Sequence, residues 1–133
     1  MNAVDTNILI RFLMRDDAQQ ANLAYRLLKE TEQRDELLFV PVAVVLEMIW
    51  VLESAYHISR EEIVASINDL LAMPIFMFET QTAVQKFTVS ARQNDFDLSD
   101  LLLAHSAAHA HCSQVFTFDK KAAKFKLFAL LAK

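Results

Sequence analysis

The sequence predicts an α/β protein built on a parallel sheet, and three observations support this class. Short apolar runs alternate along the chain with longer segments of helical periodicity, the order produced by parallel strands with helical crossovers. The short runs are apolar throughout, which is typical of strands covered on both faces. Hydrophobic residues make up 54% of the 133 residues, enough for one compact core. We therefore expect a single domain over residues 1–133, with helices on both faces of a central parallel sheet of four to five strands.

The first two predicted strands each lead into a helix. Residues 2–5 are interpreted as a strand because Thr6 can cap the helical pattern that follows them. Residues 18–33 have the spacing of an amphipathic helix. Residues 36–41 then predict a buried strand, which Pro41 closes.

Two further helices and a third strand follow. The valines of residues 42–56 would suit a strand, but the length and apolar seam of this segment favour a helix. Residues 59–72 predict a second helix, with Ser59 as its cap and Glu62 in the position of a capping box. The third strand begins after Pro74.

The last part of the chain continues the alternation. Residues 80–93 and 98–111 predict helices, and Ser99 is a plausible cap for the second of them. Residues 113–119 predict a fourth strand. The tail leaves a choice between a turn and a short helix, followed by a fifth, edge strand over residues 126–131.

Composition excludes several classes of protein. The chain has no glycine, so a glycine-rich phosphate loop is excluded, and turns with positive φ should fall on Asn, Asp or Ser. The net charge of −4 gives no general attraction for nucleic acid. The single cysteine, Cys112, fits a reducing compartment, and no apolar run reaches transmembrane length. We expect a cytoplasmic protein without membrane contact.

Four carboxylates converge on one edge of the predicted sheet. Asp5 ends the first strand and Asp119 the fourth, while Glu47 lies on the helix that leaves the second strand. Asp100 lies in the first turn of the helix before the fourth strand. Sites of parallel sheets form at the carboxyl ends of the strands. Two carboxylates about 4 Å apart repel by roughly 4 kcal/mol at an effective dielectric constant of about 20. A hard cation such as Mg²⁺ or Mn²⁺ would relieve that repulsion.

Each acid also has a structural explanation when it is taken alone. Asp5 can cap a helix, Asp119 can form a turn, and Asp100 suits the helix dipole. Glu47 is harder to explain, because its neighbours in sequence are apolar and predict no solvated face for it. The metal hypothesis therefore depends on the convergence of all four.

These residues resemble a known family. The segments "AVDTNILIRFLMRDD", "VPVAVVLEMIWVLESAYHISREEI", "FDLSDLLLAHSA" and "VFTFDKKAAK" are similar to the PIN-domain family, most closely to VapC-type toxins of bacterial toxin–antitoxin pairs. The resemblance runs over nearly the whole chain. It implies a three-layer α/β/α sandwich, a four-acid site for Mg²⁺ or Mn²⁺, and endonuclease activity on single-stranded RNA.

The resemblance also assigns roles to individual residues. The family's acids fall on Asp5, Glu47, Asp100 and Asp119 as catalytic metal ligands. The residues that would support these carboxylates are Thr6, Asn7, Asp97 and Thr117. The cations that could form a positive rim for RNA are Arg11, Lys120 and Lys121. Relatives usually have glycines before the third acid and before the last strand, so Asn94 and either His111 or Ser113 must form those turns.

The resemblance implies two protein partners. A VapB-like antitoxin would be the cognate partner, and the apolar helices over residues 42–56 and 59–72 suggest a homodimer. One sequence does not identify the target RNA or its cleavage site. The lysines of residues 120–133 are also explained by a solvated face.

Other interpretations were weighed. His105, His109, His111 and Cys112 resemble a zinc cluster, although a solvated helix end explains them without a metal. A phosphoacceptor of the response-regulator type would need an Asp at the end of the middle strand, where the chain has Glu79. A PIN domain that only binds a partner would not need four acids.

Overall fold

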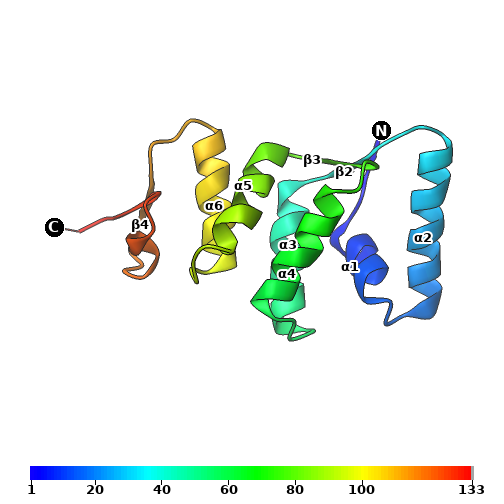
Figure 1. The fold of residues 1–133 in the computed structure, drawn as a ribbon, viewed down its shortest axis with the longest axis horizontal. Coiled ribbons are helices and arrows are strands. Elements are labelled where there is room, and N and C mark those ends of the chain that lie inside the picture. The colour runs from blue at the N-terminus through cyan, green and yellow to red at the C-terminus, as the bar shows by residue number, and fades with distance from the viewer. Residues whose placement is uncertain (133) are drawn as a thin grey trace. The chain divides into compact units, whose positions relative to one another are not determined.

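The computed structural model describes residues 1–132. The chain forms two compact units, an N-terminal unit over Met1–Glu79 and a C-terminal unit that begins at Thr80 (Figure 1). Parallel strands and helical crossovers occur in the N-terminal unit, and the C-terminal unit pairs its two strands in parallel. The α/β class is therefore confirmed.

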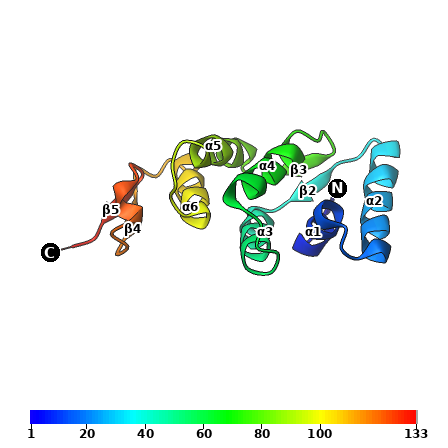
Figure 2. The ribbon, with the colours of Figure 1, turned by 60° about the horizontal axis from the view of Figure 1, so that its bottom comes forward.

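The N-terminal unit contains a three-stranded parallel sheet in the order β1-β2-β3. Leu38 of β2 pairs with Asn2 of β1 on one side and with Phe76 of β3 on the other. Four helices accompany the sheet, and α3 and α4 lie side by side in both views (Figures 1 and 2). The elements are β1 (Asn2–Ala3), α1 (Thr6–Met14), α2 (Ala18–Gln33), β2 (Leu38–Val40), α3 (Val42–Ser54), α4 (Arg60–Leu71) and β3 (Phe76–Phe78).

The helices of the N-terminal unit bury the apolar positions that their periodicity predicts. Ala24 and Leu28 are the buried apolar residues of α2, one turn apart, and Met48 and Leu52 have the same spacing on α3. Ser59 caps α4 as predicted, because its hydroxyl accepts a hydrogen bond from the backbone N–H of Glu62. The largest fully buried side chains of this unit are Leu9, Ile10, Leu38, Val40, Met48, Ile49, Leu52, Ile63, Ile67 and Leu70.

The C-terminal unit pairs two helices and adds a two-stranded parallel sheet. The tail forms a single 3₁₀ turn and then a strand, so both parts of its prediction are confirmed. Phe87 of α5 and Leu101 of α6 are fully buried, and these two helices pack together. The elements are α5 (Gln81–Ala91), α6 (Leu98–His109), β4 (Val115–Thr117), the 3₁₀ turn η1 (Ala122–Lys124) and β5 (Phe128–Leu130).

The sheet differs from the prediction in two respects. Residues 1–132 contain five parallel strands, but these form a three-stranded and a two-stranded sheet, one in each unit, instead of one sheet. The strands also alternate in exposure: Met77 of β3 is exposed between two buried phenylalanines, and Phe116 of β4 is 66% exposed. The apolar residues of these strands therefore do not all lie under helices, and one face of β3 and of β4 carries exposed apolar side chains.

Two helix caps were predicted one residue or more too late. Asp5, and not Thr6, caps α1, because the Asp5 carboxylate accepts from the first helical N–H. Asp97, and not Ser99, caps α6, and its carboxylate accepts from the N–H of Asp100, the third residue of the helix. Asp and Ser cap helices about equally well, so the sequence alone does not decide between Asp97 and Ser99 as the cap of α6.

The positive-φ positions were also predicted wrongly in part. Of the residues with positive φ in the described part of the chain, only Asp35 belongs to the expected types, and the others are Arg15, His57, Thr80 and His111. His111 was one of the residues assigned to the turn before β4, and its φ of 69° confirms that role.

Asn94 also forms its predicted turn, but through its side chain. Its Oδ1 accepts from the Phe96 N–H at 3.1 Å, and its Nδ2 donates to the Ser90 carbonyl at 2.9 Å. Within residues 1–132, no helix combines the length and the apolar character needed to cross a membrane.

Candidate active site

Asp5 lies where β1 ends and α1 begins. Its backbone is extended, with φ −87° and ψ 164°, and its Oδ1 accepts from the Thr6 N–H at 2.7 Å. The side chain is exposed and caps a helix that has no other acid in its first turn. Capping and a role as metal ligand are compatible, because a carboxylate has a second oxygen.

Thr6 joins Asp5 to Glu47. Its hydroxyl donates to Oε2 of Glu47 at 3.2 Å, while its N–H donates to Asp5. Thr6 is only 4% exposed, so this residue fixes the start of α1 against the second turn of α3. The two carboxylates predicted in this half of the chain are therefore held at one corner of the N-terminal unit by one buried threonine.

Glu47 is exposed, contrary to the expectation of an acid without a solvated face. Its position on α3 falls between Ala43 and Trp50, which are also exposed, so the helix has a narrow outward stripe. The error came from reading the apolar sequence of α3 as burial on all sides.

The Arg11 side chain forms hydrogen bonds within the N-terminal unit. Its guanidinium donates to Gln20 at 2.6 Å, to Asp16 at 3.1 Å and to the Tyr56 hydroxyl at 2.9 Å. Tyr56 in turn donates to Asp16 at 2.8 Å, and this hydrogen bond is the main reason that the pKa of the Asp16 carboxyl is lowered. These contacts tie the α1–α2 loop to the loop after α3, whereas Asn7, one turn earlier on α1, is exposed.

The C-terminal unit brings three acids together around the start of α6. Asp97 caps this helix, and its Oδ1 accepts from the Asp100 N–H at 3.1 Å. Burial raises the pKa of Asp100, and the negative charges of Asp97 and Asp119 raise it further. Asp119, the acid after β4, thus lies close enough to Asp100 to repel it.

Asp119 is held by a turn of its own. Its N–H donates to the Thr117 hydroxyl at 3.0 Å. Its Oδ1 accepts from the N–H groups of Lys121 and Ala122 at 2.8 and 3.2 Å. Thr117 therefore contacts the backbone of the last acid, whereas the predicted role was support of its carboxylate. Lys120 and Lys121 are exposed beside it.

The donor chemistry suits a hard divalent cation, but no complete ligand set is gathered. Carboxylate oxygens are the ligands that Mg²⁺ and Mn²⁺ prefer. The repulsion at Asp100 is the kind that a cation would relieve. In the described part of the chain, however, no three His, Cys, Asp or Glu side chains lie close enough to hold a metal ion. The structure thus yields two groups, Asp5 with Glu47 in one unit and Asp97, Asp100 and Asp119 in the other.

The His and Cys residues of α6 and the following loop do not form a zinc cluster among residues 1–132. His109, His111 and Cys112 are exposed. His105 is half-buried instead, with its ring 6.0 Å from that of Phe125.

Comparison with known proteins gives two matches. A model of the PIN domain family matches residues 3–127. A VapC ribonuclease from Aquifex aeolicus (strain VF5) is 27% identical over 123 residues, which cover 91% of this chain and 89% of that protein. The family match covers the positions of all four predicted acids, from Asp5 to Asp119.

Proposed function

The chain belongs to the PIN domain family, and we propose that it is a metal-dependent endoribonuclease, the toxin of a toxin–antitoxin pair. The VapC ribonuclease of Aquifex aeolicus supports this assignment through its similarity along 91% of the chain. The observation that carries the proposal is the grouping of the acids: Asp5 and Glu47 both accept from Thr6, and Asp97 and Asp119 lie within electrostatic range of Asp100.

We assign roles from the contacts of each side chain. Asp5, Glu47, Asp100 and Asp119 would together hold Mg²⁺ or Mn²⁺, which when bound activates water and neutralises charge on the scissile phosphate. Thr6 keeps Glu47 in one rotamer through its hydroxyl, and Thr117 fixes the backbone of Asp119. Asp97 orients α6 as its cap and adds negative charge beside Asp100.

The same proposal covers the RNA-binding residues. Lys120 and Lys121 are exposed next to Asp119, so they could contact the phosphates that flank the cleaved bond. Arg11 has a smaller part in this rim than the sequence implied, because its guanidinium is occupied by three neighbours. Asn7 is exposed on α1 and stays a candidate for support of the site.

The remaining expectations are part of the proposal. We expect the chain to act as one domain over residues 1–133, in the cytoplasm, as a homodimer, with a VapB-like antitoxin as its partner. A neighbouring gene for a small DNA-binding protein whose tail carries an arginine would support the antitoxin, since such an arginine can pair with carboxylates.

Removal of one carboxylate charge from each unit tests the function. We expect Asp5→Asn and Asp119→Asn each to lower the rate of RNA cleavage by at least about 100-fold, because each loses a metal ligand. Asparagine keeps the capping geometry of Asp5, so folding should be unchanged by circular dichroism.

The control is Asp69→Asn, which removes the same charge from an exposed position of α4. Its cleavage rate should equal that of the wild-type chain. Cleavage that survives treatment with EDTA, or that is unaffected by both test substitutions, would contradict the proposal.

A further inference from the structure

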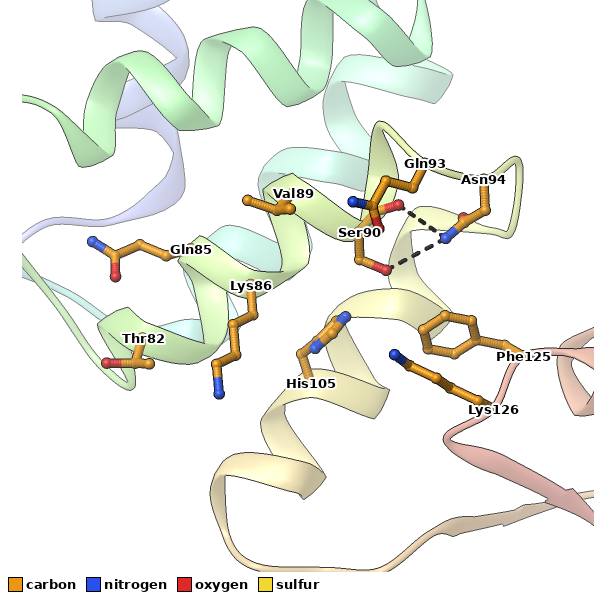
Figure 3. A pocket seen from close by; sticks show the side chains of 10 residues that line it. All are labelled: Thr82, Gln85, Lys86, Val89, Ser90, Gln93, Asn94, His105, Phe125 and Lys126. Atoms are coloured by element: carbon orange, nitrogen blue, oxygen red, sulfur yellow. Dashed lines mark hydrogen bonds between the residues drawn. The ribbon is translucent and has the colours of Figure 1, made fainter.

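A cavity of about 430 Å³ lies within the C-terminal unit, outside the groups of acids. It is lined by residues of α5, the loop after it, α6 and the segment before β5 (Figure 3). Its volume is in the range of small-molecule pockets. The lining residues are Thr82, Gln85, Lys86, Val89, Ser90, Gln93, Asn94, His105, Phe125 and Lys126.

The charges around this cavity have one sign. Lys86 and Lys126 are its charged residues, and Asp and Glu are absent from the lining. Neither ammonium group forms an ion pair with any residue of the described chain. In a protein of net charge −4, two cations without counter-ions beside one cavity are a local site for an anion.

His105 adds an unused polar atom between these cations. Its Nε2 is buried and has no hydrogen-bond partner among residues 1–132. Figure 3 shows its ring between Lys86 and Lys126. Burial lowers the pKa of His105, and the charges of Lys126 and then Lys86 lower it further, which places both lysines within electrostatic range of the ring. A buried polar atom without a partner has a cost that a ligand can remove.

The neutral groups of the lining fit a nucleotide better than a carboxylate side chain. Gln85 and Gln93 are exposed amides, and amides can hydrogen-bond to the edges of unpaired bases. Val89 offers exposed apolar surface beside them. The charged residues of the lining are lysines, and lysine binds phosphate as a point charge.

We propose that this cavity binds one nucleotide of the RNA, with its phosphate between Lys86 and Lys126 and its base beside Gln85 and Gln93. This inference rests on the proposed ribonuclease function, for which it supplies an RNA-binding subsite separate from the carboxylates. His105 donates to or accepts from the nucleotide through Nε2, depending on its tautomer.

The test is binding of a fluorescent single-stranded RNA to the full chain in EDTA, so that no cleavage occurs. We expect the double variant Lys86→Gln, Lys126→Gln to bind at least about tenfold more weakly. The slope of log affinity against log salt should fall by about 0.7, because the contact to one phosphate of a single strand is lost. Both lysines are exposed, so the fold should persist.

A matched control removes the same charge elsewhere. The double variant Arg26→Gln, Lys29→Gln changes two exposed cations of α2 in the N-terminal unit. It should keep wild-type RNA affinity and salt slope. Equal affinity and slope for the Lys86, Lys126 variant and the wild type, or no RNA binding by the wild type, would overturn the inference.

Two further measurements separate this inference from others. A polyglutamate peptide that loses affinity for the Lys86, Lys126 variant, while RNA binding is unchanged, would assign the cavity to an acidic protein and overturn the RNA assignment. Cleavage with Mg²⁺ is measured in parallel. RNA that binds through the lysines but is not cleaved refutes the proposed function alone, and RNA that is cleaved without them refutes the subsite alone.

Discussion

The two groups of acids are held in opposite ways. In the N-terminal unit, Asp5 and Glu47 each accept a hydrogen bond from Thr6, so one residue of the protein satisfies both. In the C-terminal unit, Asp100 is half-buried beside two other acids, and its pKa is raised. In the first group the protein donates hydrogen bonds to both carboxylates, whereas in the second group burial and repulsion favour the protonated form of Asp100. The difference shows that the protein itself supplies hydrogen bonds to the acids in one unit, while in the other unit it leaves like charges close together.

The largest effect is expected when the hydrogen bond from the Thr6 hydroxyl to Glu47 is removed. Thr6→Val keeps the shape of a buried side chain but leaves Glu47 without its donor. We expect metal affinity or cleavage to fall by about 10- to 100-fold, the usual effect of losing a group that orients a ligand. Isothermal titration with Mn²⁺ and a cleavage assay measure the two effects.

Thr6→Ser is the matched variant for this test, because it keeps the hydroxyl and removes only a methyl group. It should retain most of the affinity and activity. If Thr6→Val and Thr6→Ser have the same metal affinity and cleavage rate, the Thr6 hydroxyl does not position Glu47.

A smaller effect is expected when the cap of α1 is removed. Asp5→Ala should lower the free energy of unfolding by about 1 kcal/mol, because the Thr6 N–H loses its acceptor. Asp5→Asn should cost much less, since Asn caps as well as Asp does. Urea denaturation in EDTA measures both, and equal losses for the two variants would show that charge, not capping, is what Asp5 contributes to folding.

The smallest effect is expected at Asp100. Because its pKa is raised in the folded state, the folded chain takes up a proton before the unfolded chain as the pH falls. Its contribution to stability therefore increases as the pH falls from neutral through the raised pKa toward the ordinary value of 3.8, and decreases as the pH rises.

Asp100→Asn removes this dependence. In EDTA at neutral pH it should raise Tm slightly, by an amount equivalent to less than about 1 kcal/mol, because the side chain is only partly buried. With Mg²⁺ present, the wild type should recover the difference. A wild-type chain whose Tm follows pH in the same way as that of Asp100→Asn would contradict the repulsion inferred here.

The order of the elements could be predicted from the sequence because hydrophobic periodicity is a local property. The helix over residues 42–56 was distinguished from a strand by its length, and it is observed over Val42–Ser54. The exact caps could not be predicted, since Asp5 and Thr6 are both good caps and only the structure shows which carboxylate accepts. Strand exposure could not be predicted either, because it depends on what packs against each face.

The candidate site was predictable only as a set of residue types at strand ends. The sequence indicated Asp97, Asp100 and Asp119, and the structure brings these three within electrostatic range. The sequence did not indicate that Arg11 is occupied by Asp16 and Tyr56, because those contacts join segments far apart in the chain. It also gave no sign of the cavity beside His105, since Lys86 follows no motif and ordinary helix surfaces carry lysines.

The absence of glycine leaves this chain with room for thermal improvement. Arg15 and His57 sit in the left-handed region, with φ of 54° and 53°, where a side chain raises the backbone energy by roughly 1–2 kcal/mol. They follow α1 and α3 directly or within a few residues, at the ends where other proteins place glycine. Replacement of Arg15 or His57 by glycine would remove this cost and raise the thermal stability of the protein without altering any of its acids.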